Sequence, residues 1–259
     1  MIEVVGVTQH YGVRPILREV SLRVAGGELV ALMGPNRMGK STLLGVMAGI
    51  LSPQKGHVEI DGVRRRSSAE AELAIRRKVV YLPDQPWLPK ERTGREFVLA
   101  VGKLYGIDDD RLMDHTQRLV ELFHLDEQAD APIRSYSTGQ RKKIALCGVL
   151  VTDAPVLLLD EPFSGGLDPS GLLALKRVLG RLAQRKDVTI VIATPVPELM
   201  EEIAHRMAIL REGRIAAYDT ADGLRQLTGC DGPLEEVLGR MLDPDTLDAI
   251  DRYFEGQPG

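Results

Sequence analysis

Uninterrupted apolar stretches recur along the chain and predict the strands of a buried sheet. They cover residues 29–33, 79–82, 156–159 and 188–193. A strand covered on both faces carries apolar side chains at every position, whereas a half-exposed strand alternates between apolar and polar residues. The pattern therefore predicts an α/β fold built on a parallel sheet with helices against it.

Other segments predict an antiparallel layer. We expect strands at residues 2–7 and 20–24, a short hairpin at residues 58–62, and a terminal hairpin at residues 207–217 around Glu212-Gly213. Glycine and asparagine or aspartate turns between short apolar runs are typical of such hairpins.

Helical periodicity dominates residues 95–150, which we interpret as an inserted helical lobe that follows a proline-rich segment at residues 83–89. Its apolar faces are expected at Phe97, Val101 and Leu104, and at Leu119, Leu122 and Phe123. Further helices are expected at residues 170–183, with Leu172, Leu175, Val178 and Leu179 facing inward, at residues 198–204, and in an acidic-leaning tail at residues 219–259.

Composition narrows the class of protein. The 259 residues contain 33 Lys and Arg against 37 Asp and Glu, and the net charge of -4 gives no positive field for nucleic acid, so we expect no nucleic-acid partner. The two cysteines, Cys147 and Cys230, have no metal-ligand spacing. With no signal peptide and no apolar run long enough to span a bilayer, a cytoplasmic protein is expected.

A phosphate-binding loop follows the first apolar stretch. It fits the pattern G-x-x-x-x-G-K-[ST] and consists of Gly34, Pro35, Asn36, Arg37, Met38, Gly39, Lys40, Ser41 and Thr42. Backbone N–H groups and a helix N-terminus surround a phosphate in this geometry, Lys40 reaches the outer phosphates, and Ser41 ligates magnesium. Nucleotide binding is the direct interpretation.

Two carboxylates, Asp160 and Glu161, end the apolar strand at residues 156–159, where ligands bind at the carboxyl edge of a parallel sheet. Beside a phosphate loop, Asp160 is expected to hold the magnesium shell. Glu161 is expected to orient or deprotonate an attacking water.

A helix is expected to start at Ser137, Thr138, Gly139 and Gln140, and its first turn carries Arg141, Lys142 and Lys143. Positive charge is unfavourable at a helix N-terminus, so either an anion from another molecule compensates it or the basic residues are solvated beside an ordinary cap. Three other features keep two interpretations each. Tyr11 stacks on a base or packs, residues 64–66 (three arginines) meet anionic lipid headgroups or form a solvated loop, and Trp87 receives a partner or anchors the lobe.

In this order and at these separations, the phosphate loop, the Ser137-Thr138-Gly139-Gln140 segment, the Asp160-Glu161 strand end and Leu167-Asp168 resemble the ATPase subunit of an ATP-binding cassette (ABC) transporter. The single short cassette is most similar to ATPases of exporters whose membrane subunit is a separate chain. The resemblance implies a P-loop NTPase (RecA-like) core at residues 1–86 and 151–218, with an antiparallel β subdomain. It also implies a helical signature subdomain at residues 87–150 and a C-terminal helical extension at residues 219–259.

The same resemblance implies a head-to-tail dimer, of two identical or two different cassettes, with ATP and Mg²⁺ between the phosphate loop of one subunit and the signature helix of the other. Tyr11 would stack on adenine, and Asp84 or Gln85 would complete the magnesium site. Asp168 would contact the opposite subunit. A transmembrane permease would dock near residues 84–88, which places the chain on the inner face of the membrane.

Departures from the family pattern qualify these expectations. Pro195 stands where the family has a histidine that contacts the terminal phosphate, so hydrolysis is predicted to be slow. Arg37 replaces a glycine of the phosphate loop at a position where a left-handed backbone is expected, which is unfavourable for a residue with a side chain. Thr138 replaces a signature glycine, and Gly165-Gly166 adds a residue. Arg37 either adds charge near the nucleotide or points into solvent. A nucleotide-gated clamp with little hydrolysis and a cassette without a membrane partner remain as alternatives to a transport ATPase.

Overall fold

The computed structural model describes residues 1–242, 249 and 252–253. In this part of the chain the larger sheet has six strands in the order β10-β9-β3-β8-β7-β6. Their bounds are β3 (Leu29–Met33), β6 (Val79–Leu82), β7 (Val156–Asp160), β8 (Thr189–Ala193), β9 (Arg206–Arg211) and β10 (Arg214–Asp219). All neighbouring pairs are parallel except β9 with β10.

A smaller antiparallel sheet has the order β2-β1-β4-β5. Its strands are β1 (Ile2–His10), β2 (Pro15–Val24), β4 (Lys55–Ile60) and β5 (Val63–Arg64). Strands β1 and β2 are longer than predicted, because their pairing extends past the apolar core to His10 and Pro15 through irregular register.

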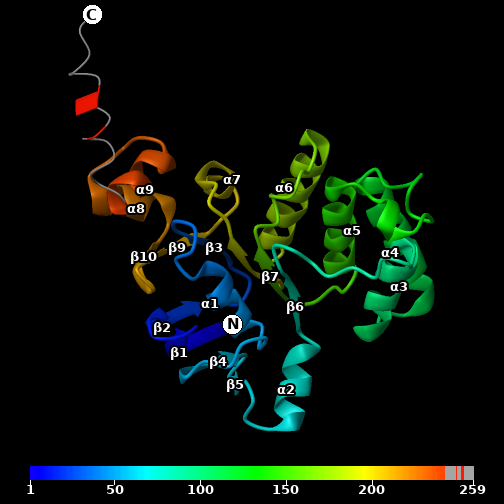
Figure 1. The fold of residues 1–259 in the computed structure, drawn as a ribbon, viewed down its shortest axis with the longest axis horizontal. Helices are drawn as coiled ribbons and strands as arrows, with labels where there is room; N and C mark the ends of the chain where they lie inside the picture. The colour runs from blue at the N-terminus through cyan, green and yellow to red at the C-terminus, as the bar shows by residue number, and fades with distance from the viewer. Residues whose placement is uncertain (243–248, 250–251, 254–259) are drawn as a thin grey trace, which may run out of the picture.

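The helices cover both faces of the parallel sheet (Figure 1). Their bounds are α1 (Lys40–Met47), α2 (Ala69–Arg76), α3 (Gly94–Leu104), α4 (Asp109–Leu122), α5 (Thr138–Leu150), α6 (Pro169–Gln184), α7 (Pro197–Glu201), α8 (Ala221–Thr228) and α9 (Leu234–Leu242). Figure 1 shows α3, α4 and α5 at one end of the molecule, beyond β6, and α8 and α9 at the other. None of these helices has both the length and the apolarity that crossing a bilayer requires.

Strand β3 explains why the core strands are apolar throughout. Leu29, Ala31 and Met33 join the cluster on the side of α3 to α6, whereas Val30 and Leu32 join the cluster shared with α1 and the small sheet. All five residues of β3 are buried, as are all five of β7 and of β8. The two-sided burial predicted from the sequence is confirmed, and the fold is the P-loop NTPase type with an antiparallel sheet and added helices.

Several helix details differ from the prediction. Leu119 and Phe123 are buried as predicted, but Leu104 is 82% exposed and Leu122 is exposed as well, because Val98 and Val120 complete the packed faces of α3 and α4. The helix predicted at residues 198–204 is shorter, because α7 ends at Glu201. The Ala204 N–H nevertheless donates to the Met200 carbonyl.

Helix α2 was not predicted, and the Ser68 cap starts it. In the tail, α8 and α9 fall within the predicted helical extension. The remainder of that prediction, residues 243–248, 250–251 and 254–259, lies outside the described residues.

Candidate nucleotide site

The phosphate loop connects the carboxyl end of β3 to the N-terminus of α1. Gly34 and Gly39 have left-handed φ values of 146° and 99°. A Cβ at Gly34 would lie 2.3 Å from the Leu210 carbonyl oxygen, and one at Gly39 would lie 2.9 Å from Leu17 Cδ2, so only glycine fits. Because Gly39 caps α1 without a side-chain acceptor, the first N–H groups of the helix are left available for an anion.

Lys40 is buried, and its ammonium group lies across its own loop. Nζ donates to the carbonyl oxygens of Gly34 at 2.7 Å and Pro35 at 3.0 Å. Burial lowers the pKa of Lys40, while the charges of Glu161 and Asp160 act in the opposite direction. When a nucleotide binds, phosphate oxygens would replace these two carbonyls as partners of the ammonium group.

The two predicted carboxylates lie at the edge of the sheet beside this loop. Asp160 is the last residue of β7 and is buried, and its Oδ1 has no hydrogen-bond partner. Burial raises the pKa of Asp160, and the hydrogen bond with Ser41 lowers it. The backbone of Glu161 is left-handed (φ 45°), and its N–H donates to the Ala193 carbonyl at 2.8 Å. Burial also raises the pKa of Glu161, and the charge of Asp84 adds to the effect.

A magnesium ion fits this donor set. Ser41 and Asp160 are in contact, and Asp160 Oδ1 is a buried acceptor that lacks a donor. Hydroxyl and carboxylate oxygens are ligands that Mg²⁺ prefers, together with phosphates and water. Among the described residues no group of three or more Asp, Glu, His or Cys side chains could hold a metal ion without other ligands.

Of the two alternatives at the end of β6, Asp84 is the residue that faces the carboxylates. Its charge raises the pKa of both Asp160 and Glu161, and its Oδ1 accepts a hydrogen bond from Ser164 Oγ at 3.2 Å. Asp84 and Gln85 are both exposed and both line the hollow beside Trp87, but only the charge of Asp84 acts on the two carboxylates.

Lys142 is a site residue that the sequence analysis did not identify as one. It is only 3% exposed, and its Nζ donates to the Asp84 carbonyl at 3.2 Å. Burial lowers its pKa, and the charges of Asp84, Asp160 and Glu161 oppose that shift. A second cation from α5 therefore faces the carboxylates. The only sequence signal for it was a charge of the wrong sign in the first turn of a helix.

The predicted signature segment begins α5 through a capping box. Ser137 Oγ accepts from the Gln140 N–H at 3.2 Å, and Gln140 Oε1 accepts from the Ser137 N–H at 2.8 Å. The ordinary cap is thus present. Solvation of all three basic residues is wrong, because Lys143 is buried and pairs with Asp168 at 2.9 Å. Asp168 also caps α6.

A hollow of about 540 Å³ opens beside this cap. Ser137, Gly139 and Gln140 line it together with Gly166 and Asp168, and no residue of the phosphate loop does. A Cβ on Gly139 would lie 2.4 Å from the Gly166 carbonyl oxygen. Within one chain the signature segment and the phosphate loop therefore line separate surfaces. Thr138 faces the neighbouring hollow beside Trp87.

Three remaining predicted positions lie at the rim of the site. Tyr11 is 58% exposed in the connection between β1 and β2. Arg37 is exposed with φ 66°, the left-handed conformation expected there. Pro195 is exposed directly after buried Thr194, whose N–H donates to the Leu32 carbonyl. His205 Nδ1 accepts from the N–H of Leu29 at 2.9 Å, at the opposite end of β3 from the loop.

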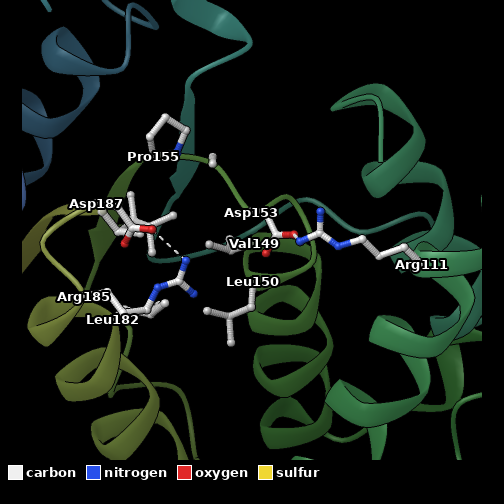
Figure 2. A pocket seen from close by; sticks show the side chains of 11 residues that line it. Arg111, Val149, Leu150, Asp153, Pro155, Leu182, Arg185 and Asp187 are labelled. Carbon is white, nitrogen blue, oxygen red and sulfur yellow. Dashed lines mark hydrogen bonds and ion pairs between the residues drawn. The ribbon is translucent and has the colours of Figure 1, made fainter. Parts of the chain in front are cut away.

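Two other hollows differ in character. One of about 830 Å³ is lined by Trp87, Leu88 and Ile133 with basic residues around them, and Trp87 is 83% exposed there. The other, about 200 Å³, lies between α4, α5 and α6 (Figure 2). Arg111 pairs with Asp153 at its side and Arg185 pairs with Asp187 at 2.7 Å. Because its charges are paired and it adjoins the amino ends of β7 and β8, it is not the nucleotide site.

The fold and the loop define a P-loop nucleotide-binding ATPase. The profile of the ABC transporter family matches residues 17–164. The chain is 32% identical over 230 residues to the daunorubicin resistance ATP-binding protein DrrA3 of Streptomyces coeruleorubidus, covering 89% of this chain and 71% of that protein. It is 33% identical over 251 residues to the Nod factor export ATP-binding protein I of Rhizobium meliloti, covering 96% and 72%.

Solved structures agree with these relatives. An ATP-binding subunit of an ABC transporter superposes with a TM-score of 0.86 at 27% identity, covering 93% of this chain and 99% of that one. The fold is also shared with the dimeric cassette MJ0796, with a TM-score of 0.77 at 24% identity over 85% and 98% of the two chains. The chain belongs to the ABC transporter family and is an ATP-binding cassette ATPase.

Proposed function

We propose that this chain is the ATP-hydrolysing subunit of an exporter, acting as a dimer with a separate transmembrane permease at the inner face of the cell membrane. The observation that carries the proposal is the meeting of Lys40, Ser41, Asp160 and Glu161 at one edge of the sheet. Export is supported by relatives whose names describe Nod factor export and daunorubicin resistance. A cytoplasmic location suits the charge and cysteine content.

Each group at this edge has a role in hydrolysis. Lys40 turns from the Gly34 and Pro35 carbonyls to the outer phosphates. Ser41 and Asp160 would hold Mg²⁺, which would supply positive charge against the phosphates. Glu161, whose carboxylate is made more basic by burial and by Asp84, orients the water and accepts its proton. Asp84, and not Gln85, completes the magnesium surroundings.

A second cassette completes the site. The Ser137–Gln140 cap and the hollow beside it are open in a single chain, and the N–H groups of a capped helix start bind anions well. A triphosphate held by Lys40 and Gly39 of one subunit would be covered by Ser137, Thr138, Gly139 and Gln140 of the other. Tyr11 would stack on the base, and the Asp168–Lys143 pair would lie at the contact between identical or different cassettes.

The permease would occupy the 830 Å³ groove. Its wall of Trp87, Leu88 and Ile133 and its basic residues suit an amphipathic helix with acidic positions. Because Asp84 lines this groove and its charge acts on Glu161, a change at the nucleotide site would reach the groove through this residue.

Pro195 supports a second candidate, a nucleotide-gated clamp with little hydrolysis. It follows Thr194 at the edge of the sheet and offers no donor to the terminal phosphate. Lys40, Asp160 and Glu161 are all present, and this favours slow hydrolysis over none.

Thermal unfolding with Mg-ATP tests the site, with Lys40→Ala as the variant and Lys55→Ala, an exposed lysine on β4, as the control. At 100 times Kd, ATP adds about 2.7 kcal/mol of stability. Wild type and Lys55→Ala should show this rise in Tm, and Lys40→Ala should not. Turnover that increases on co-expression of the permease supports transport. The clamp would be favoured by a Tm rise without turnover, and equal Tm shifts in all three proteins would refute the assigned site.

A further inference from the structure

A small basic pocket lies at the end of α1 that is remote from the phosphate loop. It has a volume of about 210 Å³ and lies between the C-terminal end of α1 and the β4–β5 hairpin. Its charged lining comes from His57, Arg64, Arg65 and Arg66, and Gly49 forms part of its wall. Because α1 has eight residues, the pocket is about 12 Å from the start of that helix.

Arg65 forms the buried back of the pocket, contrary to the expectation of a solvated loop. Its side chain is 5% exposed. Nε donates to the Met47 carbonyl at 2.7 Å and Nη1 to Glu72 Oε1 at 2.9 Å, but buried Nη2 has no acceptor among the described residues. A buried donor on a charged group without a partner is costly. The absence of a Cβ at Gly49 leaves room for this side chain, since a Cβ there would lie 2.5 Å from Arg65 Nη1.

The neighbouring arginines add charge at the mouth. Arg66 has a left-handed backbone (φ 60°), which is strained for a residue with a side chain, and its Nη2 donates to the Gly49 carbonyl at 2.8 Å. The exposed guanidinium of Arg64 has no partner within the described part of the chain. Two carboxylates lie near these arginines, and both have other partners: Glu72 also pairs with Arg76, and Glu59 pairs with His57. The pocket is therefore positive overall.

We propose that this pocket binds a phosphate dianion. Arginine forks match the oxygens of a phosphate, and the unpartnered Arg65 Nη2 supplies a reason for a ligand beyond the Met47 and Gly49 carbonyls that the arginines already bind. The volume is below the range of pockets that enclose a drug-sized molecule, so a single phosphate group fits and a nucleotide does not. The proposal is independent of the hydrolysis and transport proposed above.

The His57 imidazole signal in proton NMR reports on the pocket directly, since the chain has only five histidines and His57→Gln assigns the signal. The full chain, saturated with magnesium nucleotide to fill the phosphate loop, is titrated with inorganic phosphate at ionic strength held constant with chloride. We expect a saturable shift.

Arg64→Ala should weaken phosphate binding at least tenfold, because it removes charge-assisted hydrogen bonds. Arg240→Ala, an exposed arginine on α9, should not change it. Because Arg64 is exposed, its loss leaves the fold intact, and matching melting curves confirm this. Equal phosphate affinities in Arg64→Ala and Arg240→Ala would overturn the proposal.

The phosphate has two chemical sources, which sedimentation with vesicles distinguishes. If it belongs to a lipid headgroup, wild type co-sediments with phosphatidic acid vesicles and not with phosphatidylcholine vesicles, and Arg64→Ala loses the difference. If it is a soluble anion, the NMR titration saturates and both kinds of vesicle leave the protein in solution. Absence of both responses refutes the site.

Discussion

Replacing Pro195 with histidine should accelerate hydrolysis. Pro195 is exposed and follows Thr194, whose N–H is fixed to the Leu32 carbonyl at the carboxyl edge of β3 and β8. The next strand end places Glu161 beside it, because the Glu161 N–H bonds to the Ala193 carbonyl. A side chain at position 195 thus starts two residues after Ala193, whose carbonyl binds the Glu161 N–H, and the position is exposed.

The magnitude follows from adding one preorganised donor. A single donor of this type contributes roughly 2.7–4 kcal/mol to the transition state, or about 100- to 1,000-fold in rate. Loss of the proline ring costs about 0.4–1 kcal/mol of folding stability by freeing the unfolded chain. Proline has no backbone N–H, so its replacement by histidine removes no backbone hydrogen bond. We therefore expect a large rise in kcat with a small fall in Tm.

Steady-state phosphate release measures this, with Pro195→Ala as the matched control that removes the ring without supplying a donor. Pro195→His should exceed wild type by two orders of magnitude in kcat, and Pro195→Ala should stay within about threefold of it. If Pro195→His hydrolyses ATP at the wild-type rate, or if both variants accelerate equally, the reasoning about the missing donor fails.

Two further predictions concern the same edge. Burial raises the pKa of Asp160, so its contribution to stability is complete below the pKa of the unfolded chain and is lost as pH rises through the folded value. Asp160→Asn should therefore melt higher than wild type at pH 8 without nucleotide, and the difference should shrink toward pH 5; a constant difference would contradict this. Arg37→Gly relieves a left-handed arginine (φ 66°) and should raise the free energy of unfolding by up to about 1 kcal/mol in urea titrations. If the guanidinium lies near the nucleotide, ATP affinity falls in the same variant, and unchanged affinity means that it points into solvent.

The core of the fold was accessible from sequence because its strands are buried on both faces. Strands β3 and β6 were predicted with the bounds that the structure has, and β7 within one residue. The left-handed backbone at Arg37 was also predicted, because the resembling family has a glycine at that position. The division into subdomains and the roles of the individual site residues stay predictions.

The errors concern residues whose surroundings come from distant parts of the chain. A charged residue is normally expected at the surface, but Lys142 and Arg65 are both buried. Each finds a partner on another element, Asp84 for Lys142 and Glu72 for Arg65. Leu104 was expected inside on the basis of helical spacing, but it is the last residue of α3 and is 82% exposed. The apolar spacing within one helix does not show how far the neighbouring helices extend along it.

By itself the sequence determined the strand-loop-helix that binds phosphate and the apolar strand that delivers Asp160 and Glu161, because those properties are local: a glycine loop, a lysine and an unbroken apolar run. Only the tertiary structure decided which of Asp84 and Gln85 faces the carboxylates, that Lys143 is neutralised by Asp168, and that the arginines of residues 64–66 surround a pocket. These outcomes depend on contacts between residues far apart in the chain, and the free energy of burying a charge is set by the partner it meets there.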